Sequence, residues 1–306
     1  MVVFTILFFL SISSLVIMPS STSQVQRTTI FIQSDGSVSP QNVPIQRDGS
    51  VYTFSDNVYD PILIQKSNVT LNGAGYSLIG PLTAKDIKAE QVLGFGPNTT
   101  IQVQYIIGVD FDKNVSGVTI KNLNIGNFSI GVYIRTTQNI LLSNGVEDNV
   151  VGVLLSGSAN TISKSYIANN KEGLFFGFEQ KNHNADNIPS DIKISENSFI
   201  NNSIQFSGCV CKVYNFSETK HSWDDGKKGN YWSNYNGTDV DHDGLGDTPY
   251  VIDVLNQDRY PLMQSVAFPP TAKASLSVCP MILVIALTII VAVLALVFLS
   301  RRRKKL

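Results

Sequence analysis

The sequence repeats itself every 21 residues over residues 116–178. Three consecutive blocks read SGVTIKNLNIGNFSIGVYIRT, TQNILLSNGVEDNVVGVLLSG and SANTISKSYIANNKEGLFFGF. Each block holds three short apolar runs separated by Asn, Ser or Gly, and in the first block these runs are residues 118–120, 123–125 and 132–134. Three short strands and three corners in every block predict a solenoid with three sides, in which each block forms one coil.

Within each apolar run, Val, Ile and Leu alternate with Thr, Ser or Lys, which places one set inside the solenoid and the other outside. An insertion at 179–189 interrupts the pattern, which resumes at Ser190. Weaker matches occur at 67–80 and 108–111. The sequence therefore predicts an all-β parallel β-helix. A β-sandwich is the alternative, but the constant period argues against it.

Asparagine and aspartate recur at one corner of the repeat. The positions concerned are Asn127, Asp148 and Asn169, then Asn149 and Asn170 one residue later, and Asn201 and Asn202 after the insertion. Asn side chains can hydrogen-bond from coil to coil, and both Asn and Asp tolerate the left-handed backbone of a tight corner. We therefore expect these residues to stack along the solenoid.

Both ends of a solenoid need covers, because an exposed β edge invites aggregation. Residues 24–66 have strand character without the repeat and are predicted to form an N-terminal cap. Coils are expected over 67–222, and residues 223–264 are expected to cover the other end.

The two termini indicate export and anchoring. Residues 1–23 are apolar and then small, which is typical of a secretory signal peptide; an uncleaved anchor is the alternative. Residues 281–299 are apolar and uncharged, and at about 1.5 Å per residue they match a hydrocarbon core of roughly 30 Å. A stalk at 265–280 precedes this span, and a basic tail at 300–306 follows it. The tail predicts a cytoplasmic C-terminus and an external main domain at the cell membrane.

Charge and glycosylation motifs agree with that placement. Five of the 23 basic residues lie in the tail, which leaves 18 against 24 acidic side chains, a net charge of about −6. Such a surface predicts no nucleic-acid partner, because binding to phosphates needs a positive face. Seven N-x-S/T sequons are candidate glycosylation sites. They begin at Asn68, Asn98, Asn114, Asn127, Asn201, Asn215 and Asn236.

The stretch DVDHDGLGD at residues 239–247 predicts a calcium site. Asp239, Asp241 and Asp243 occupy the first, third and fifth positions of a calcium loop, Leu245 offers its carbonyl, and Asp247 follows. The twelfth position is a tyrosine, so the usual bidentate glutamate is missing and Asp253 or Asp258 would have to complete the sphere. We expect a structural Ca²⁺ ion; a solvent-exposed turn is the alternative.

Four aromatic residues in the C-terminal cap, Trp223, Tyr231, Trp232 and Tyr235, are candidates for stacking on sugar rings. The alternative is that the two tryptophans plug the solenoid. Catalytic carboxylates are not predicted, because Glu147 and Glu172 stand 25 residues apart and fall out of register. A non-catalytic binding role is therefore favoured over a polysaccharide lyase or glycoside hydrolase.

The repeat pattern NxTIxxNxIxNNxxGVxL resembles the repeats of the NosD-like family, also described as carbohydrate-binding and sugar-hydrolysis (CASH) β-helices. Residues 44–54 (PIQRDGSVYTF), 69–76 (VTLNGAGY), 223–253 and 258–263 (DRYPLM) look like exported archaeal members of that group. The resemblance covers about residues 28–263. It implies a right-handed parallel β-helix of the pectin-lyase type and a link to sugar binding or processing.

The copper in the NosD name is not expected to transfer to this chain. Copper sites need clustered His, Met or Cys ligands, whereas His183, His221 and His242 are scattered in the sequence. The hypotheses kept open are a binding module for glycans or envelope components, a polysaccharide lyase or glycoside hydrolase, a structural envelope protein or adhesin, and a NosD-like copper-related accessory protein.

Overall fold

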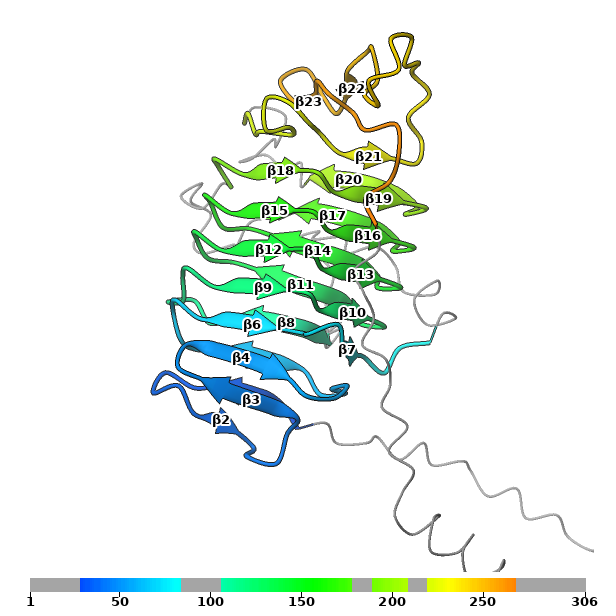
Figure 1. Ribbon diagram of the computed structural model, residues 1–306. Coiled ribbons are helices and arrows are strands. Elements are labelled where there is room, and N and C mark those ends of the chain that lie inside the picture. Colours follow the sequence, from blue (N-terminus) through cyan, green and yellow to red (C-terminus); the bar gives the residue numbers. More distant parts are fainter. Residues whose placement is uncertain (1–27, 84–105, 178–188, 209–218, 268–306) are drawn as a thin grey trace, which may run out of the picture.

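The computed structural model describes residues 28–83, 106–177, 189–208 and 219–267. These residues form 23 strands and no helix. The strands stack into three sheets along one axis, with the first coils at one end and the cap of residues 219–267 at the other (Figure 1). The described part of the chain contains no helix with the length and apolarity to cross a membrane. The predicted signal peptide and the span at 281–299 lie outside the described residues.

Sheet A has eight strands. In spatial order they are β2 (Val38–Ser39), β1 (Ile30–Ile32), β5 (Ile62–Ile64), β8 (Ile107–Phe111), β11 (Ile130–Ile134), β14 (Val151–Leu155), β17 (Glu172–Phe176) and β20 (Ile204–Gly208). Sheet B contains β18 (Lys193–Ser195), β15 (Thr161–Ser163), β12 (Ile140–Leu142), β9 (Thr119–Lys121), β6 (Thr70–Asn72), β4 (Val51–Phe54) and β3 (Ile45–Asp48). Sheet C contains β21 (Tyr231–Trp232), β19 (Ser198–Ile200), β16 (Tyr166–Ala168), β13 (Gly145–Glu147), β10 (Asn124–Gly126) and β7 (Ser77–Ile79). A small hairpin pairs β22 (Tyr250–Val251) with β23 (Gln257–Asp258).

The strand register confirms the 21-residue repeat. Ile120, Leu141 and Ile162 are successive partners in sheet B, each 21 residues after the last, and all three are buried. Ile194 follows after 32 residues, because the insertion adds eleven. Almost every pair in the three sheets is parallel, which is the arrangement of a parallel β-helix rather than a sandwich.

The predicted asparagine corner is confirmed and separates into two roles. Asn127, Asp148, Asn169 and Asn201 have φ between 51° and 66°, so they make the left-handed bend. The next residue in each coil is buried and carries the hydrogen bonds: the Asn149 backbone N–H donates to Oδ1 of Asn170 at 2.9 Å, and the Asn170 N–H donates to Asn202 in the same way. The ladder thus replaces backbone pairing where the chain turns.

A second ladder, which the repeat did not predict, continues into the cap. Its backbone N–H donors and side-chain acceptors run from Asn144 to Ser165, then to Asn197, Asn230 and Asp258. The sequence separations are 21, 32, 33 and 28 residues. This ladder joins the regular coils to the cap through buried polar groups.

The N-terminal segment is more regular than predicted. Strands β1, β4 and β5 already pair in parallel with later coils, so they form the first coil rather than a separate cap. Only β2 and β3 pair antiparallel and cover the edges of sheets A and B. β2 is two residues long, and β3 carries the exposed charged residues Arg47 and Asp48; short or charged edge strands discourage further strands from adding.

Aromatic side chains close the C-terminal end. Trp232 lies between Phe199 of the last coil and Tyr250 of the hairpin, with ring centroids 4.4 and 4.3 Å apart and planes within 9° of parallel. Trp223 packs edge-on against Phe206 at 4.8 Å. Both tryptophans are 1% exposed, so they end the core by covering it.

Candidate functional site

The aspartate loop brings three carboxylates together. One oxygen from each of Asp239, Asp241 and Asp243 lies within 4.8 Å of the others, and among the described residues this is the one group of three or more His, Cys, Asp or Glu side chains so arranged. Backbone N–H groups of Asp243 and Gly244 donate to the Asp239 carboxylate at 3.1 Å. All the donors to this cluster are neutral amides, so the three negative charges remain uncompensated by any cation of the loop.

The loop is tied to the segment that closes the solenoid. The Gly246 N–H donates to the Pro261 carbonyl at 2.8 Å, and the Met263 N–H donates to the Gly244 carbonyl at 3.0 Å. The Tyr235 ring fits against Gly237 and Gly246, where an added methyl group would overlap its hydroxyl. The glycines of the motif therefore make room for a tyrosine as well as forming a turn.

The remaining expected calcium ligands are placed elsewhere. Asp247 accepts hydrogen bonds from the Val240 N–H and from Thr238, so it braces the loop from outside the cluster. Asp253 caps its own turn by accepting from Leu255 and Asn256. Asp258 is 0% exposed and accepts from Trp232 Nε1 at 2.9 Å. Neither Asp253 nor Asp258 belongs to the cluster of three carboxylates, because each accepts hydrogen bonds elsewhere in the cap.

The four aromatic candidates do not form one sugar platform. Trp223 and Trp232 are each 1% exposed in the end core, so neither ring offers an open stacking platform, and the packing supports the alternative that they plug the solenoid. Tyr235 is half-buried and donates its hydroxyl hydrogen to the Thr248 carbonyl, which fixes it in the loop. Tyr231 is half-buried on the outer side of sheet C, in register with Ser198 and Tyr166.

Five of the seven sequons lie in the described residues. Asn68, Asn114, Asn201 and Asn236 are exposed and Asn127 is half-exposed, so an attached glycan would meet no core packing there. Asn98 and Asn215 lie outside the described residues.

An open groove runs along the outer face of sheet B and ends against the cap; we call it the sheet B groove. Its volume is about 630 Å³. The outward residues of neighbouring strands stack there: Thr161 beside Lys193, and Ser163 beside Ser195. The far wall is formed by residues 224–226 and Arg259.

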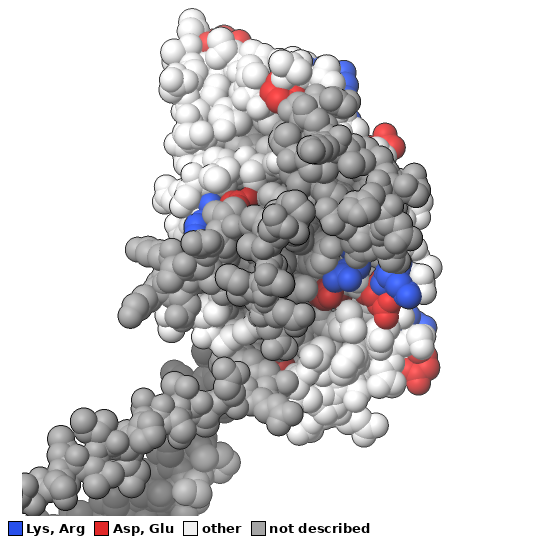
Figure 2. Space-filling model, turned by 180° about the vertical axis from the view of Figure 1, so that it is seen from behind, with Lys and Arg blue, Asp and Glu red and all other residues white. Residues whose placement is uncertain are grey.

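The charges of the sheet B groove are largely paired. Arg259 binds Asp224 in a two-pronged contact, with Nε to Oδ2 at 3.0 Å and Nη2 to Oδ1 at 2.6 Å. Burial acts to raise the pKa of Asp224, but the hydrogen bonds from Arg259 and Gly226 outweigh it and hold the pKa below its usual range. Lys164 lies 3.8 Å from Glu196. Figure 2 shows the same interspersion on the opposite side, where acidic and basic side chains neighbour each other in small groups.

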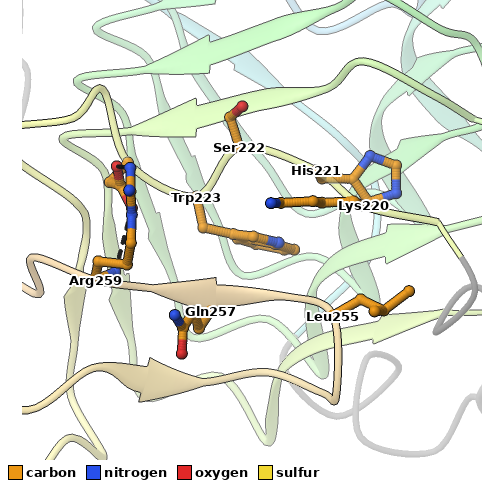
Figure 3. A pocket seen from close by; sticks show the side chains of 8 residues that line it. Lys220, His221, Ser222, Trp223, Leu255, Gln257 and Arg259 are labelled. Carbon is orange, nitrogen blue, oxygen red and sulfur yellow. Dashed lines mark hydrogen bonds and ion pairs between the residues drawn. The ribbon is translucent and has the colours of Figure 1, made fainter.

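A smaller cavity lies on the other side of the Arg259–Asp224 pair, beneath the β22–β23 hairpin (Figure 3); we call it the hairpin pocket. Its volume is about 270 Å³. Besides that ion pair, Lys220, His221, Trp223 and Gln257 contribute to the lining. Sequence reasoning missed this pocket, because its residues come from two segments that the cap brings together.

The acidic residues of the coils do not converge on one site. Glu147 lies on β13 of sheet C, whereas Glu172 lies on β17 of sheet A. Glu172 is 1% exposed, accepts a short hydrogen bond from Ser207 Oγ, and has its pKa raised by burial. A hydrolase of the two-carboxylate type needs such groups on either side of one bond, which these two do not provide.

The histidines and the methionine of the described residues are not gathered around one point. His221 packs edge-on against Phe176 in the core, and His242 is exposed in the aspartate loop with φ of 60°. Met263 closes the solenoid end, and His183, Cys209 and Cys211 lie outside the described residues. The converging group that the structure does contain offers oxygen ligands alone.

No curated protein matches the chain significantly. A family model described as "Periplasmic copper-binding protein (NosD)" matches residues 13–237, about three quarters of the chain. The match spans the coils and the first part of the cap. The chain belongs to the NosD family.

Proposed function

We propose that this protein is a non-catalytic binding protein that displays its β-helix outside the cytoplasm and binds glycans or envelope components in the sheet B groove. The observation that carries the proposal is the groove itself, an open cleft of about 630 Å³ in which Ser and Thr hydroxyls repeat from strand to strand. The periplasmic description of the family and the exposed sequons support the location. Anchoring by a helix at 281–299 belongs to the same proposal.

The chemistry of the groove favours a polyhydroxylated ligand without strong charge. Thr161, Ser163 and Ser195 each offer a hydroxyl that both donates and accepts hydrogen bonds. Arg259 is paired with Asp224, and Lys164 lies near Glu196, so a neutral ligand would leave these two ion pairs in place. Strands about 4.8 Å apart repeat these groups at a spacing that suits an extended chain.

A glycan array probed with the full-length chain tests this proposal. Lys193→Ala together with Ser195→Ala removes two groups of the groove, and we expect binding to weaken about tenfold or more. Lys121→Ala is the matched control, since Lys121 lies on the same sheet three strands away. Equal binding by both variants, or an array without a single hit, contradicts the proposal and favours the structural or adhesin hypothesis.

The enzymatic alternative is tested separately. Incubation with acidic polysaccharides would release unsaturated or shortened products if the chain were a lyase or hydrolase. We expect none, because the coil carboxylates Glu147 and Glu172 lie on different sheets.

We further propose that the aspartate loop holds a structural Ca²⁺ ion. Carboxylate oxygens within 4.8 Å repel by about 1 kcal/mol per pair in water and several-fold more near a protein surface. A hard divalent cation removes that repulsion, and the Leu245 carbonyl of the same loop is an additional oxygen. Because the loop is bonded to Pro261 and Met263, the ion would stabilise the closure of the solenoid.

Calorimetric titration with Ca²⁺ tests the loop. We expect heat at millimolar Ca²⁺ and a higher Tm, both lost in Asp243→Ala and retained in Asp253→Ala. No heat in the unaltered chain, or equal heat in Asp243→Ala, removes the ion from the proposal.

Copper forms no part of the proposal. Copper favours imidazole and sulfur ligands, and the described residues bring no such set together. The oxygen cluster fits Ca²⁺ instead.

A further inference from the structure

The lining of the hairpin pocket combines one ion pair with one lysine outside any ion pair of the described residues. Arg259 is neutralised by Asp224, while Lys220 has no ion pair within the described ranges. Lys220 lies across the pocket between Trp223 and His221 (Figure 3). The lining therefore carries one uncompensated positive charge, in a domain predicted to have an excess of acids.

His221 gives the second, independent observation. It is 5% exposed, and in the described structure neither ring nitrogen has a hydrogen-bond partner. The T-shaped contact with Phe176, at 4.9 Å, can satisfy one N–H at most. A buried polar group left without a partner costs about 1–3 kcal/mol, and a ligand would compensate that cost if the ring turned its edge toward the pocket.

Hydrogen bonds fix the backbone around this histidine. The His221 backbone N–H donates to Asn256 Oδ1 at 2.8 Å, and Trp223 Nε1 donates to the same oxygen at 3.2 Å. Asn256 in turn donates to Asp253 and to the Thr219 carbonyl. The hairpin and the segment of His221 are thus held together without a hydrogen bond from the imidazole ring. Both ring nitrogens are buried, and the ring can turn toward the pocket without breaking a hydrogen bond of the described structure.

We propose that the hairpin pocket binds a small singly charged carboxylate ligand. Lys220 would pair with the carboxylate, while His221 and Gln257 would hydrogen-bond its polar groups. A volume of about 270 Å³ admits a ligand of monosaccharide size. The nearby carboxylates of Asp253 and Asp191 oppose a more highly charged anion, and Asp253 is already bonded within its own turn. This proposal is independent of the sheet B groove, since it rests on Lys220 and His221.

D-Glucuronate and D-glucose are matched probes, because they differ in the carboxylate alone. Thermal unfolding and calorimetry on the full-length chain are expected to show binding of glucuronate at millimolar concentration and at least tenfold weaker binding of glucose. Lys220→Gln, an exposed substitution that leaves the fold intact, should reduce the glucuronate affinity about tenfold or more. Lys113→Gln replaces an exposed lysine outside both the hairpin pocket and the sheet B groove, so it should leave the affinity unchanged.

His221→Phe separates a binding role from packing. Without unsatisfied nitrogens the free protein should be at least as stable as the original, while the glucuronate-induced rise in Tm is lost. The proposal is overturned if glucuronate does not bind, if glucose binds as well, or if His221→Phe and Lys220→Gln both bind glucuronate normally. Failure of the glycan array with success here would reject the groove and retain the pocket.

Discussion

The asparagine ladder makes a quantitative prediction at Asn170. Its side chain accepts from the Asn149 N–H at 2.9 Å and from Asn149 Nδ2 at 3.1 Å, and donates to the Val146 carbonyl at 3.0 Å and to Asn202 at 2.9 Å. Replacement by Ala removes all four bonds from a site that is 2% exposed. The Asn149 N–H and the Val146 carbonyl lose these partners, at about 1–3 kcal/mol each, so the expected destabilisation is about 4 kcal/mol.

Thermal unfolding followed by circular dichroism measures this cost. For a chain of this size about 4 kcal/mol corresponds to a Tm lowered by roughly 8–16 °C. Asn169→Gly is the matched control: Asn169 is the exposed neighbour with φ of 55°, a conformation that glycine adopts readily, so its Tm should change by only a few degrees. Asn170→Asp keeps the acceptor and loses the donor, so it should destabilise the chain more at pH 7 than at pH 5. If Asn170→Ala unfolds at the same temperature as Asn169→Gly, the ladder does not stabilise the coils.

Three further predictions concern the cap. Burial raises the pKa of Asp258 to about 6, so the folded chain binds that proton more tightly than the unfolded chain, and this contribution to stability is lost as the pH rises from about 4 to 6. Burial lowers the pKa of His221 to about 4, so the contribution of His221 to stability grows as the pH rises from about 4 to 6.5. Each residue changes the free energy of unfolding by about 3 kcal/mol over its pH range, with opposite sign. Relative to the original chain, Asp258→Asn keeps only the His221 contribution, so its urea midpoint should fall more steeply at acid pH. His221→Phe keeps only the Asp258 contribution, so its urea midpoint should decline as the pH rises. Gly246→Ala should displace the Tyr235 ring and weaken Ca²⁺ binding at least tenfold in calorimetry, and unchanged affinity would refute that coupling. Trp232→Ala should lower stability by about 3–5 kcal/mol in urea titration, since it empties the stack between Phe199 and Tyr250; a smaller loss than for an exposed Tyr59→Ala would show that the ring does not close the core.

The sequence predicted the coils well because their spacing is regular. Positions 21 apart, such as Ile120 and Leu141, become neighbours in the sheet with no further information. The second ladder escaped prediction because Ser165 replaces an asparagine and the separations grow to 32 and 33 residues beyond it. The insertion lies within the 32-residue step, and the 33-residue step leads from the last coil into the cap, so a fixed period of 21 finds neither position.

Residue type alone could not decide the roles in the cap. An exposed tryptophan can stack on a sugar and a buried one can plug a core, and only the packing of Trp232 against Phe199 distinguishes the two cases. In the same way Asp243 and Asp258 look alike in sequence, yet one faces solvent among other carboxylates and the other is fully buried. The hairpin pocket could not be predicted from the sequence, because Lys220 and Gln257 lie 37 positions apart and line one cavity only once the hairpin has folded back.

The end of the second ladder explains how the solenoid stops. Each asparagine in it accepts a hydrogen bond from the preceding coil and uses its own backbone N–H to donate to the next, so the ladder could continue through any number of coils. Asp258 accepts from the Asn230 N–H at 2.6 Å and from the Tyr260 N–H at 3.1 Å, and an ionised carboxylate has no hydrogen to donate. An acidic side chain at this position therefore satisfies the last coil and presents acceptors alone within the cap. The desolvation that raises its pKa is the cost of ending the ladder in the core, and the hydrogen bonds from Trp232 and Asn230 partly offset that cost.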